Sequence, residues 1–208
     1  MSRLAIFFTL SIFAFATFAQ ADDLKVGQAL TPGQVLRGQF IQLRSLEGFQ
    51  APLKSEGHFV VAAGRGLIWI VEKPFPTTTV ITPAGLVQEA RGNETLRLAA
   101  SRIPFMSRLY DMLSGTMSGD WSQLKKDFTV ASSGSEKNWQ LRLTPAKSDN
   151  KAALPIQEMD VQGDSFVNSV DIRRPNGDRD QLQFHDQSVD TQPLSAEEAK
   201  LLDNANKQ

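Results

Sequence analysis

The stretch Leu67-Ile68-Trp69-Ile70-Val71-Glu72 is the strongest indication of fold class in the sequence. Most of its residues are β-branched or aromatic, and such residues favour extended strands. Successive side chains of a strand point to opposite faces. One face therefore carries Leu67, Trp69 and Val71, and the other carries Ile68 and Ile70. We predict a β-strand at residues 67–72 and a mainly β protein around it.

Further strands are predicted on both sides of this stretch. Turn signals rich in Gly, Pro and Asn recur about every 8 to 12 residues, as in an antiparallel meander. The other strand candidates begin at Val35 and continue at residues 58–62, 77–82, 86–89, 95–99, 128–130, 138–144, 156–161, 166–172 and 181–184. We expect a single domain over residues 22–208, with a large curved antiparallel sheet and helices packed on one of its faces.

Helices are predicted in the middle and at the end of the chain. A helical stripe of apolar residues at three- and four-residue steps consists of Met106, Leu109, Tyr110, Leu113 and Met117. A capping-box pattern at Asp120 opens a second short helix over residues 121–126. Another capping box at Ser195 and Glu198 opens a third helix that ends near Asp203.

The first 21 residues are predicted to be a secretory signal peptide. A positive charge at Arg3 precedes an apolar run over residues 4–18, and Ala19-Gln20-Ala21 forms an A-x-A cleavage pattern. The run is also shorter than the roughly 20 residues of a membrane span. We therefore expect residues 1–21 to be removed and residues 22–208 to be exported.

Composition argues against several kinds of function. Lys and Arg number 22 against 23 Asp and Glu, so clustered positive charge for nucleic acid is not expected. The chain has no Cys, which excludes disulfides, thiolate metal sites and thiol nucleophiles. His58 and His185 lack metal-ligand spacing, and the nucleophile elbow and the phosphate-binding glycine loops are missing. We expect no enzyme activity, metal or cofactor.

A group of carboxylates leaves one enzymatic alternative open. The late strand region contains Asp160, Asp164, Asp171, Asp178 and Asp180. Two of them could pair in space for acid–base hydrolysis. The interpretation that we prefer is a solvated sheet edge, charged so that it does not pair with another chain.

The remaining signal is apolar. One side of the curved sheet is predicted to carry Phe40, Phe59, Val61, Leu67, Trp69, Leu141 and Met159. The helical stripe at residues 106–113 would face them. These residues form either an ordinary core or the wall of a cavity, since Met and aromatic side chains suit a wall that refits around flexible ligands. Periodicity alone favours the ordinary core.

Several motifs in order resemble the LolA-type outer-membrane lipoprotein carriers. Gly38-Gln39-Phe40-Ile41-Gln42 is followed by Gly57-His58-Phe59-Val60-Val61 and then by the Trp69 strand, which ends at Pro74. Further matches to the family's pattern are Gly85, Ile103-Pro104-Phe105-Met106, Ser118-Gly119-Asp120-Trp121 and residues 139–145. The resemblance is clearest over residues 35–145.

The resemblance implies an unclosed antiparallel β half-barrel, covered on its concave face by a helical lid. Acyl chains of a lipoprotein would bind between sheet and lid in a hydrophobic cavity. The residues implied as its lining are Phe40, Phe59, Val61, Leu67, Trp69, Met106, Leu109 and Leu113. The resemblance further implies a periplasmic carrier, which we expect to be monomeric, that takes cargo from an inner-membrane release complex to an outer-membrane acceptor.

One position departs from the family's pattern. Many such carriers have an Arg, followed by Pro, that contacts the lid, and here Ala63 and Gly64 occupy those places. Arg65 lies two residues further on and is the candidate for this lid latch. Because of this departure, the resemblance does not decide whether the cargo is a lipoprotein. A carrier for another acylated or polyene lipid is the second hypothesis, and the carboxylate hydrolase is the third.

Overall fold

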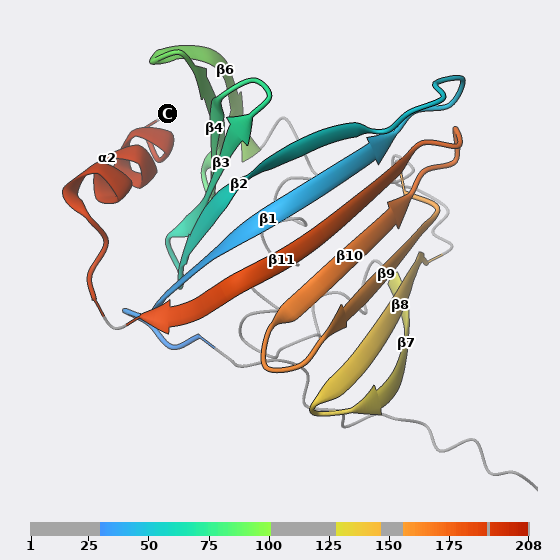
Figure 1. Ribbon diagram of the computed structural model, residues 1–208. Helices are drawn as coiled ribbons and strands as arrows, with labels where there is room; N and C mark the ends of the chain where they lie inside the picture. Colours follow the sequence, from blue (N-terminus) through green and yellow to red (C-terminus); the bar gives the residue numbers. More distant parts are fainter. Residues whose placement is uncertain (1–29, 101–127, 147–155, 191, 208) are drawn as a thin grey trace, which may run out of the picture.

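A single antiparallel sheet of eleven strands makes up most of the protein (Figure 1). The computed structural model describes residues 30–100, 128–146, 156–190 and 192–207. The strands are β1 Val35–Ser45, β2 Leu53–Ala62, β3 Gly66–Lys73, β4 Thr77–Thr82, β5 Gly85–Ala90, β6 Asn93–Ala99, β7 Phe128–Ser135, β8 Asn138–Pro145, β9 Glu158–Gly163, β10 Val167–Arg173 and β11 Arg179–Asp190. One helix, α2 Ala196–Ala205, follows them. The prediction of a mainly β fold is confirmed.

The strand order shows that the sheet is open. It runs β6-β5-β4-β3-β2-β1-β11-β10-β9-β8-β7, so β6 and β7 are its edges in the described part of the chain. The pairing of β1 with β11 joins a meander of early strands to a meander of late strands. Both ends of the sheet bend to the same side, and the sheet is an unclosed half-barrel with a concave and a convex face (Figure 1). Such bending follows from the right-handed twist that accumulates from strand to strand.

Helix α2 packs on the convex face, against β3, β4 and β5. The core beneath it contains Ile68 and Val80 of the sheet and Leu202 of the helix, each at most 1% exposed. The helix begins at the predicted capping box, where Ser195 accepts a hydrogen bond from the backbone N–H of Glu198 and the Glu198 carboxylate accepts one from the Ser195 N–H. The predicted third helix is therefore confirmed, two residues longer than expected.

The concave face carries the other two apolar clusters. Antiparallel partners point to the same face, and the register therefore defines one continuous surface from β3 to β8. The cluster on the early strands includes Phe40, Phe59, Val61 and Leu67, and the one on the late strands includes Trp139, Leu141, Leu143 and Met159. All seven residues predicted to share one side of the sheet lie on this face.

Three strands are much longer than the sequence predicted. Strand β2 begins at Leu53 rather than at residue 58, because it pairs with β1 as far as Arg44. Strand β7 was expected over residues 128–130, yet it continues to Ser135 because its backbone pairs with β8 up to Asn138. Strand β11 extends over Arg179–Asp190 because it pairs with β1 along nearly its whole length. The predicted helices at residues 106–117 and 121–126 lie outside the described residues. No helix in the described ranges is long and apolar enough to cross a membrane.

Candidate functional site

Two glycine–phenylalanine pairs shape the concave face on β1 and β2. The register places Gly38 opposite Phe59 and Phe40 opposite Gly57. A Cβ atom at Gly38 would lie 2.7 Å from the Phe59 ring, so the ring occupies the space that a side chain would take. A Cβ atom at Gly57 would lie 1.9 Å from the carbonyl oxygen of Ile70, so β3 approaches too closely for any side chain. Each phenylalanine therefore faces a residue without a side chain.

These pairs let four aromatic rings meet across four strands. Phe40 of β1 stacks on Trp69 of β3 with ring centroids 3.7 Å apart, over the strand that carries Gly57. Phe59 lies 6.2 Å from Trp69 at an interplanar angle of 21°. Phe184 of β11 packs its edge against Phe59 at 5.5 Å and against Trp69 at 6.1 Å. Such stacked and edge-to-face arrangements stabilise beyond the apolar area that they bury.

Sequence reasoning placed five of these concave-face residues together, and the structure groups all five in one cluster. Phe40, Phe59, Val61 and Leu67 are 1–6% exposed, and Trp69 is half-buried. Phe184 was not predicted to belong to this group, although its alternation with Leu182 was a signal. It is also half-buried, so Trp69 and Phe184 are the two rings of the cluster that are partly exposed.

The late strands continue the apolar face without charged side chains at its centre. Trp139 is 0% exposed and lies over Gly163, where a Cβ atom would be 2.3 Å from the indole. Its Nε1–H donates to the carbonyl oxygen of Asp164 at 2.6 Å. Leu141 and Met159 lie beside it in the same cluster. Glycine again provides the room for the large aromatic ring.

One end of the concave face is polar. Asp180 of β11 is only 1% exposed and lies opposite Arg44 of β1. Its carboxylate accepts hydrogen bonds from Arg44 Nε at 2.7 Å and Gln42 Nε2 at 3.0 Å, and forms an ion pair with Arg174 Nη1 at 2.6 Å. Burial raises the pKa of Asp180, but these hydrogen bonds and charges outweigh it, and the pKa lies below its ordinary value.

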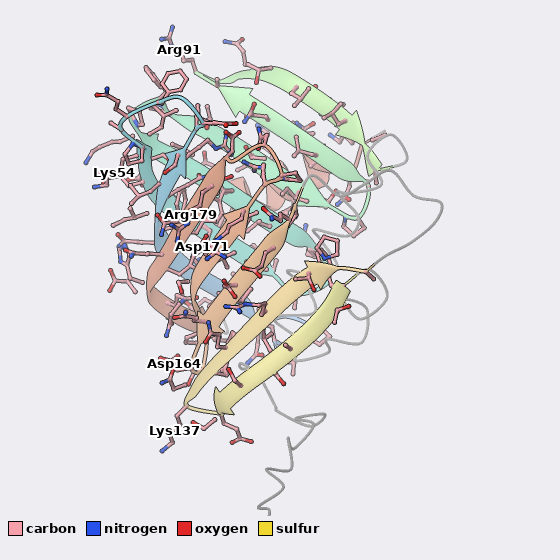
Figure 2. All side chains as sticks on the ribbon, turned by 90° about the vertical axis from the view of Figure 1, so that its right-hand side faces the viewer. Lys54, Arg91, Lys137, Asp164, Asp171 and Arg179 are labelled. Atoms are coloured by element: carbon pink, nitrogen blue, oxygen red, sulfur yellow. The ribbon has the colours of Figure 1, made fainter. Side chains whose placement is uncertain are left out.

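The interpretation of the late carboxylates as a solvated sheet edge was wrong. Strands β9, β10 and β11 lie inside the sheet, and Asp160 is 8% exposed between its neighbours. The convex side carries a network of cross-strand ion pairs. Arg142 pairs with Asp160, and Arg179 pairs with Asp171, both labelled in Figure 2. A carboxylate inside a sheet needs a partner for its charge, and arginines on adjacent strands provide it.

Asp164 and Asp171 are poorly suited to act as general acids. The hydrogen bond from Arg179 lowers the pKa of Asp171, and the one from Asn168 is the main cause that lowers the pKa of Asp164. A general acid needs a raised pKa to hold its proton at neutral pH. No group of His, Asp and Glu with metal-binding geometry occurs among the described residues.

The structure describes the predicted latch residue but not the predicted lid residues. Met106, Leu109 and Leu113 lie outside the described residues, so their contacts with the sheet stay a prediction. Arg65 lies in the turn between β2 and β3, where its Nη2 donates to Asp203 of α2 at 2.7 Å. This contact connects the turn to the helix of the convex face, while the latch role stays untested.

A half-barrel with an apolar, aromatic concave face defines the class of protein, and the sequence identifies the family. Residues 16–198 match the family model described as outer membrane lipoprotein carrier protein LolA-like. Since the match spans most of the sequence, the protein belongs to this LolA-like family. A sequence search among curated proteins gives no match.

Solved structures with similarity to this chain include a LolA superfamily protein from Nitrosomonas europaea. It is 8% identical, with a TM-score of 0.42, and the match covers 78% of this chain and 89% of that one. The MucA/MucB complex of Pseudomonas aeruginosa matches at 11% identity and a TM-score of 0.42, over 79% of this chain and 54% of that one. A DUF1329 family protein from Desulfovibrio piger matches at 9% identity and a TM-score of 0.40, over 79% and 88%. The family assignment rests on the sequence match.

Proposed function

We propose that this protein is a periplasmic carrier that shields the acyl chains of a lipoprotein and delivers it towards the outer membrane. Membership of the LolA-like family supports the role. The observation that carries the assignment of the site is the aromatic cluster of Phe40, Phe59, Trp69 and Phe184 on the concave face. Its half-buried rings extend into a surface that is apolar across the neighbouring strands.

The energetics fit a carrier without bond chemistry. Burying one methylene is worth about 0.8 kcal/mol, so ten methylenes give roughly 8 kcal/mol before the costs of binding. This affinity holds a chain through water, but it also opposes release. A carrier therefore benefits from an empty state in which its own side chains cover the acyl site, because covering it lowers the net affinity.

The residues of the cluster differ in exposure. Phe40, Phe59, Val61 and Leu67 are buried, whereas Trp69 and Phe184 are half-buried, so cargo first contacts Trp69 and Phe184. It reaches the deeper residues only when the concave side opens. In this mechanism Met106, Leu109 and Leu113 form the lid that moves, and Arg65 is the candidate that links the sheet to that movement.

Further parts of the proposal rest on the sequence patterns described above and on the family. Residues 1–21 act as a cleaved signal peptide, and residues 22–208 form the exported domain. An inner-membrane release complex supplies the cargo, and an outer-membrane acceptor receives it. The carrier acts as a monomer and catalyses no reaction.

Native mass spectrometry of protein purified from the periplasm tests the function directly. We expect the protein to carry a bound acylated polypeptide. A Trp69→Glu variant should lose it. A His58→Gln variant is the control and should retain it, because His58 of neighbouring β2 points to the convex face. Folding of both variants is verified by circular dichroism. Normal loading of the Trp69 variant would contradict the assigned site.

The stacked rings favour one second candidate cargo. Phe40 and Trp69 are inclined by only 23°, and flat ring faces of this kind suit a planar conjugated chain. For a carrier of a polyene lipid, the mass spectrum would show a bound lipid without polypeptide, and the purified protein would absorb visible light. A bound lipid without polypeptide would therefore replace the first candidate by the second.

A further inference from the structure

The concave face is amphipathic along the strands. On β1, the side chains that point to this face pass from Leu36 through Phe40 to Gln42 and Arg44. At about 3.4 Å per residue, Phe40 and Arg44 are separated by roughly 14 Å along the strand. An amphiphile that lies along β1 with its tail on the aromatic cluster therefore has its polar end beside Arg44.

The polar end is built from side chains of four structural segments. Arg44 comes from β1, Asp180 from β11 and Ser55 from β2, while Arg174 follows β10. Ser55 Oγ donates to Gln42 Oε1 at 3.4 Å, and Gln42 donates to Asp180. The buried carboxylate of Asp180 thus fixes Gln42 and both guanidinium groups in place.

The two arginines have donor capacity to spare. Arg44 uses only Nε on Asp180, and Arg174 uses Nη1. Among the described residues, no partner binds the two Nη groups of Arg44 or the Nη2 of Arg174. The side chains of Arg44 and Arg174 are 45% and 27% exposed, so both reach the surface of the protein.

The surrounding charges leave this donor group available. The two arginines and Asp180 together carry one positive charge. The acidic neighbours in the adjacent turns are Glu47 and Asp178. Neither forms an ion pair with these arginines, although the charges of both arginines help to lower the pKa of Asp178. Asp178 instead accepts hydrogen bonds from the backbone N–H of Glu47 and from Asn176.

We infer that Arg44 and Arg174 form a head-group subsite that takes an oxyanion, a phosphate or carboxylate, attached to the acyl chain of the cargo. Guanidinium groups have donors only, so they require an acceptor, and their planar fork matches two oxygens of one oxyanion. Asp180 is a positioning residue, because it orients both arginines without reaching the ligand. The inference rests on the proposed function, since the tail must occupy the aromatic cluster.

Isothermal titration with two probes of equal chain length, dodecyl phosphate and dodecanol, tests the subsite. We expect the wild-type protein to bind dodecyl phosphate roughly tenfold more tightly than dodecanol, because the guanidinium groups form charge-assisted hydrogen bonds with the phosphate. Arg44→Gln and Arg174→Gln should lose this preference while they still bind dodecanol, which also shows that they are folded. Arg44→Lys, which keeps the positive charge beside Asp180, replaces Arg44→Gln if that variant does not fold.

Arg173→Gln is the matched control, because Arg173 is adjacent in sequence but pairs with Glu158 on the convex face. It should keep the preference. Equal affinity of the wild type for both probes would overturn the subsite, and so would an unchanged preference in the Arg44 and Arg174 variants. In either case, binding of dodecanol would still support the carrier function. Inorganic phosphate that binds as tightly as dodecyl phosphate would reassign the arginines to a free anion. Binding of neither dodecyl probe would overturn the carrier function itself.

Discussion

At the scale of single residues, the two glycines under the aromatic rings differ in what a methyl group would meet. At Gly57 the obstacle is a backbone carbonyl of β3, which cannot move without breaking the strand pairing. At Gly38 the obstacles are the Phe59 ring and the Gln187 side chain, at 2.7 Å and 2.9 Å. Side chains adjust at lower cost than paired strands.

We therefore expect Gly57→Ala to lower the free energy of unfolding by more than about 3 kcal/mol, and Gly38→Ala by about 1 to 2 kcal/mol. Gly38→Ala should also displace the Phe59 ring and change the near-ultraviolet circular dichroism of the aromatic cluster. Urea denaturation measures both stabilities. Gly64→Ala is the control, since its Cβ meets nothing within 4 Å and only its positive φ of 74° is unfavourable. Equal losses at Gly38 and Gly57 would contradict the assignment of the obstacles.

Asp180 makes stability depend on pH. Its pKa in the folded protein lies below the ordinary value of an aspartate, so its charged form stabilises the fold at neutral pH. The contribution is fully present at pH 7 and is lost as the pH falls below about 4 through the folded-state pKa.

Asp180→Asn should cost about 1 to 3 kcal/mol at pH 7, because a buried carboxylate that accepts two hydrogen bonds and pairs with Arg174 loses its charge. The difference from the wild type should shrink as the pH falls below 4. Thermal unfolding across that pH range provides the measurement. Asp171→Asn, on the more exposed convex side of neighbouring β10, should cost less than about 1 kcal/mol. A constant difference at every pH would show that the charge of Asp180 does not stabilise the fold.

At the scale of elements, helix α2 is held by burial more than by its ion pairs. Leu202 and Ala205 are buried against the convex face, whereas Arg65 and Asp203 are both well exposed. A second ion pair joins Arg37 to Glu198, and Arg97 donates to the carbonyl oxygens of Asn204 and Lys207. An exposed pair such as Arg65 with Asp203 contributes little to stability.

Leu202→Ala should therefore lower the free energy of unfolding by about 2 to 5 kcal/mol. Arg65→Ala should lower it by less than about 1 kcal/mol. Chemical denaturation, monitored by the circular dichroism signal of the helix, measures the loss of stability in each variant. If Arg65→Ala proved the more damaging change, its bond to Asp203 would be a major tether of the helix and the ranking argued here would be wrong.

Local signals predicted individual elements well. The alternation of Trp139, Leu141 and Leu143 gave a strand with one buried face, and the capping box at Ser195 gave the start of α2. The Ser-Gly stretch that ends β7 was not predicted to be part of a strand, because its composition is that of a loop, while pairing with β8 keeps it extended. Propensity is a weak guide where a neighbouring strand supplies the hydrogen bonds.

At the scale of the whole molecule, pairings between distant segments were beyond sequence reasoning. Phe184 joins the aromatic cluster, and Asp180 joins Arg44, only because β11 returns to lie beside β1. Nothing in the local pattern specifies that return. The shared face of Phe40, Phe59 and Trp69 was predictable, because it depends on alternation within neighbouring strands of the meander.

The same long-range pairing predicts where the sheet is most stable. Strands β1 and β11 each have a neighbour on both sides and connect the early and late meanders, whereas β6 and β7 are edges of the described sheet. Central strands open only with most of the structure, while edge strands separate in smaller events. We expect native-state hydrogen exchange to be slowest in β1 and β11 and fastest in β6 and β7. Exchange in β1 that is as fast as in β7 would mean that the two meanders separate readily, and the concave face would then not act as one surface for a cargo chain.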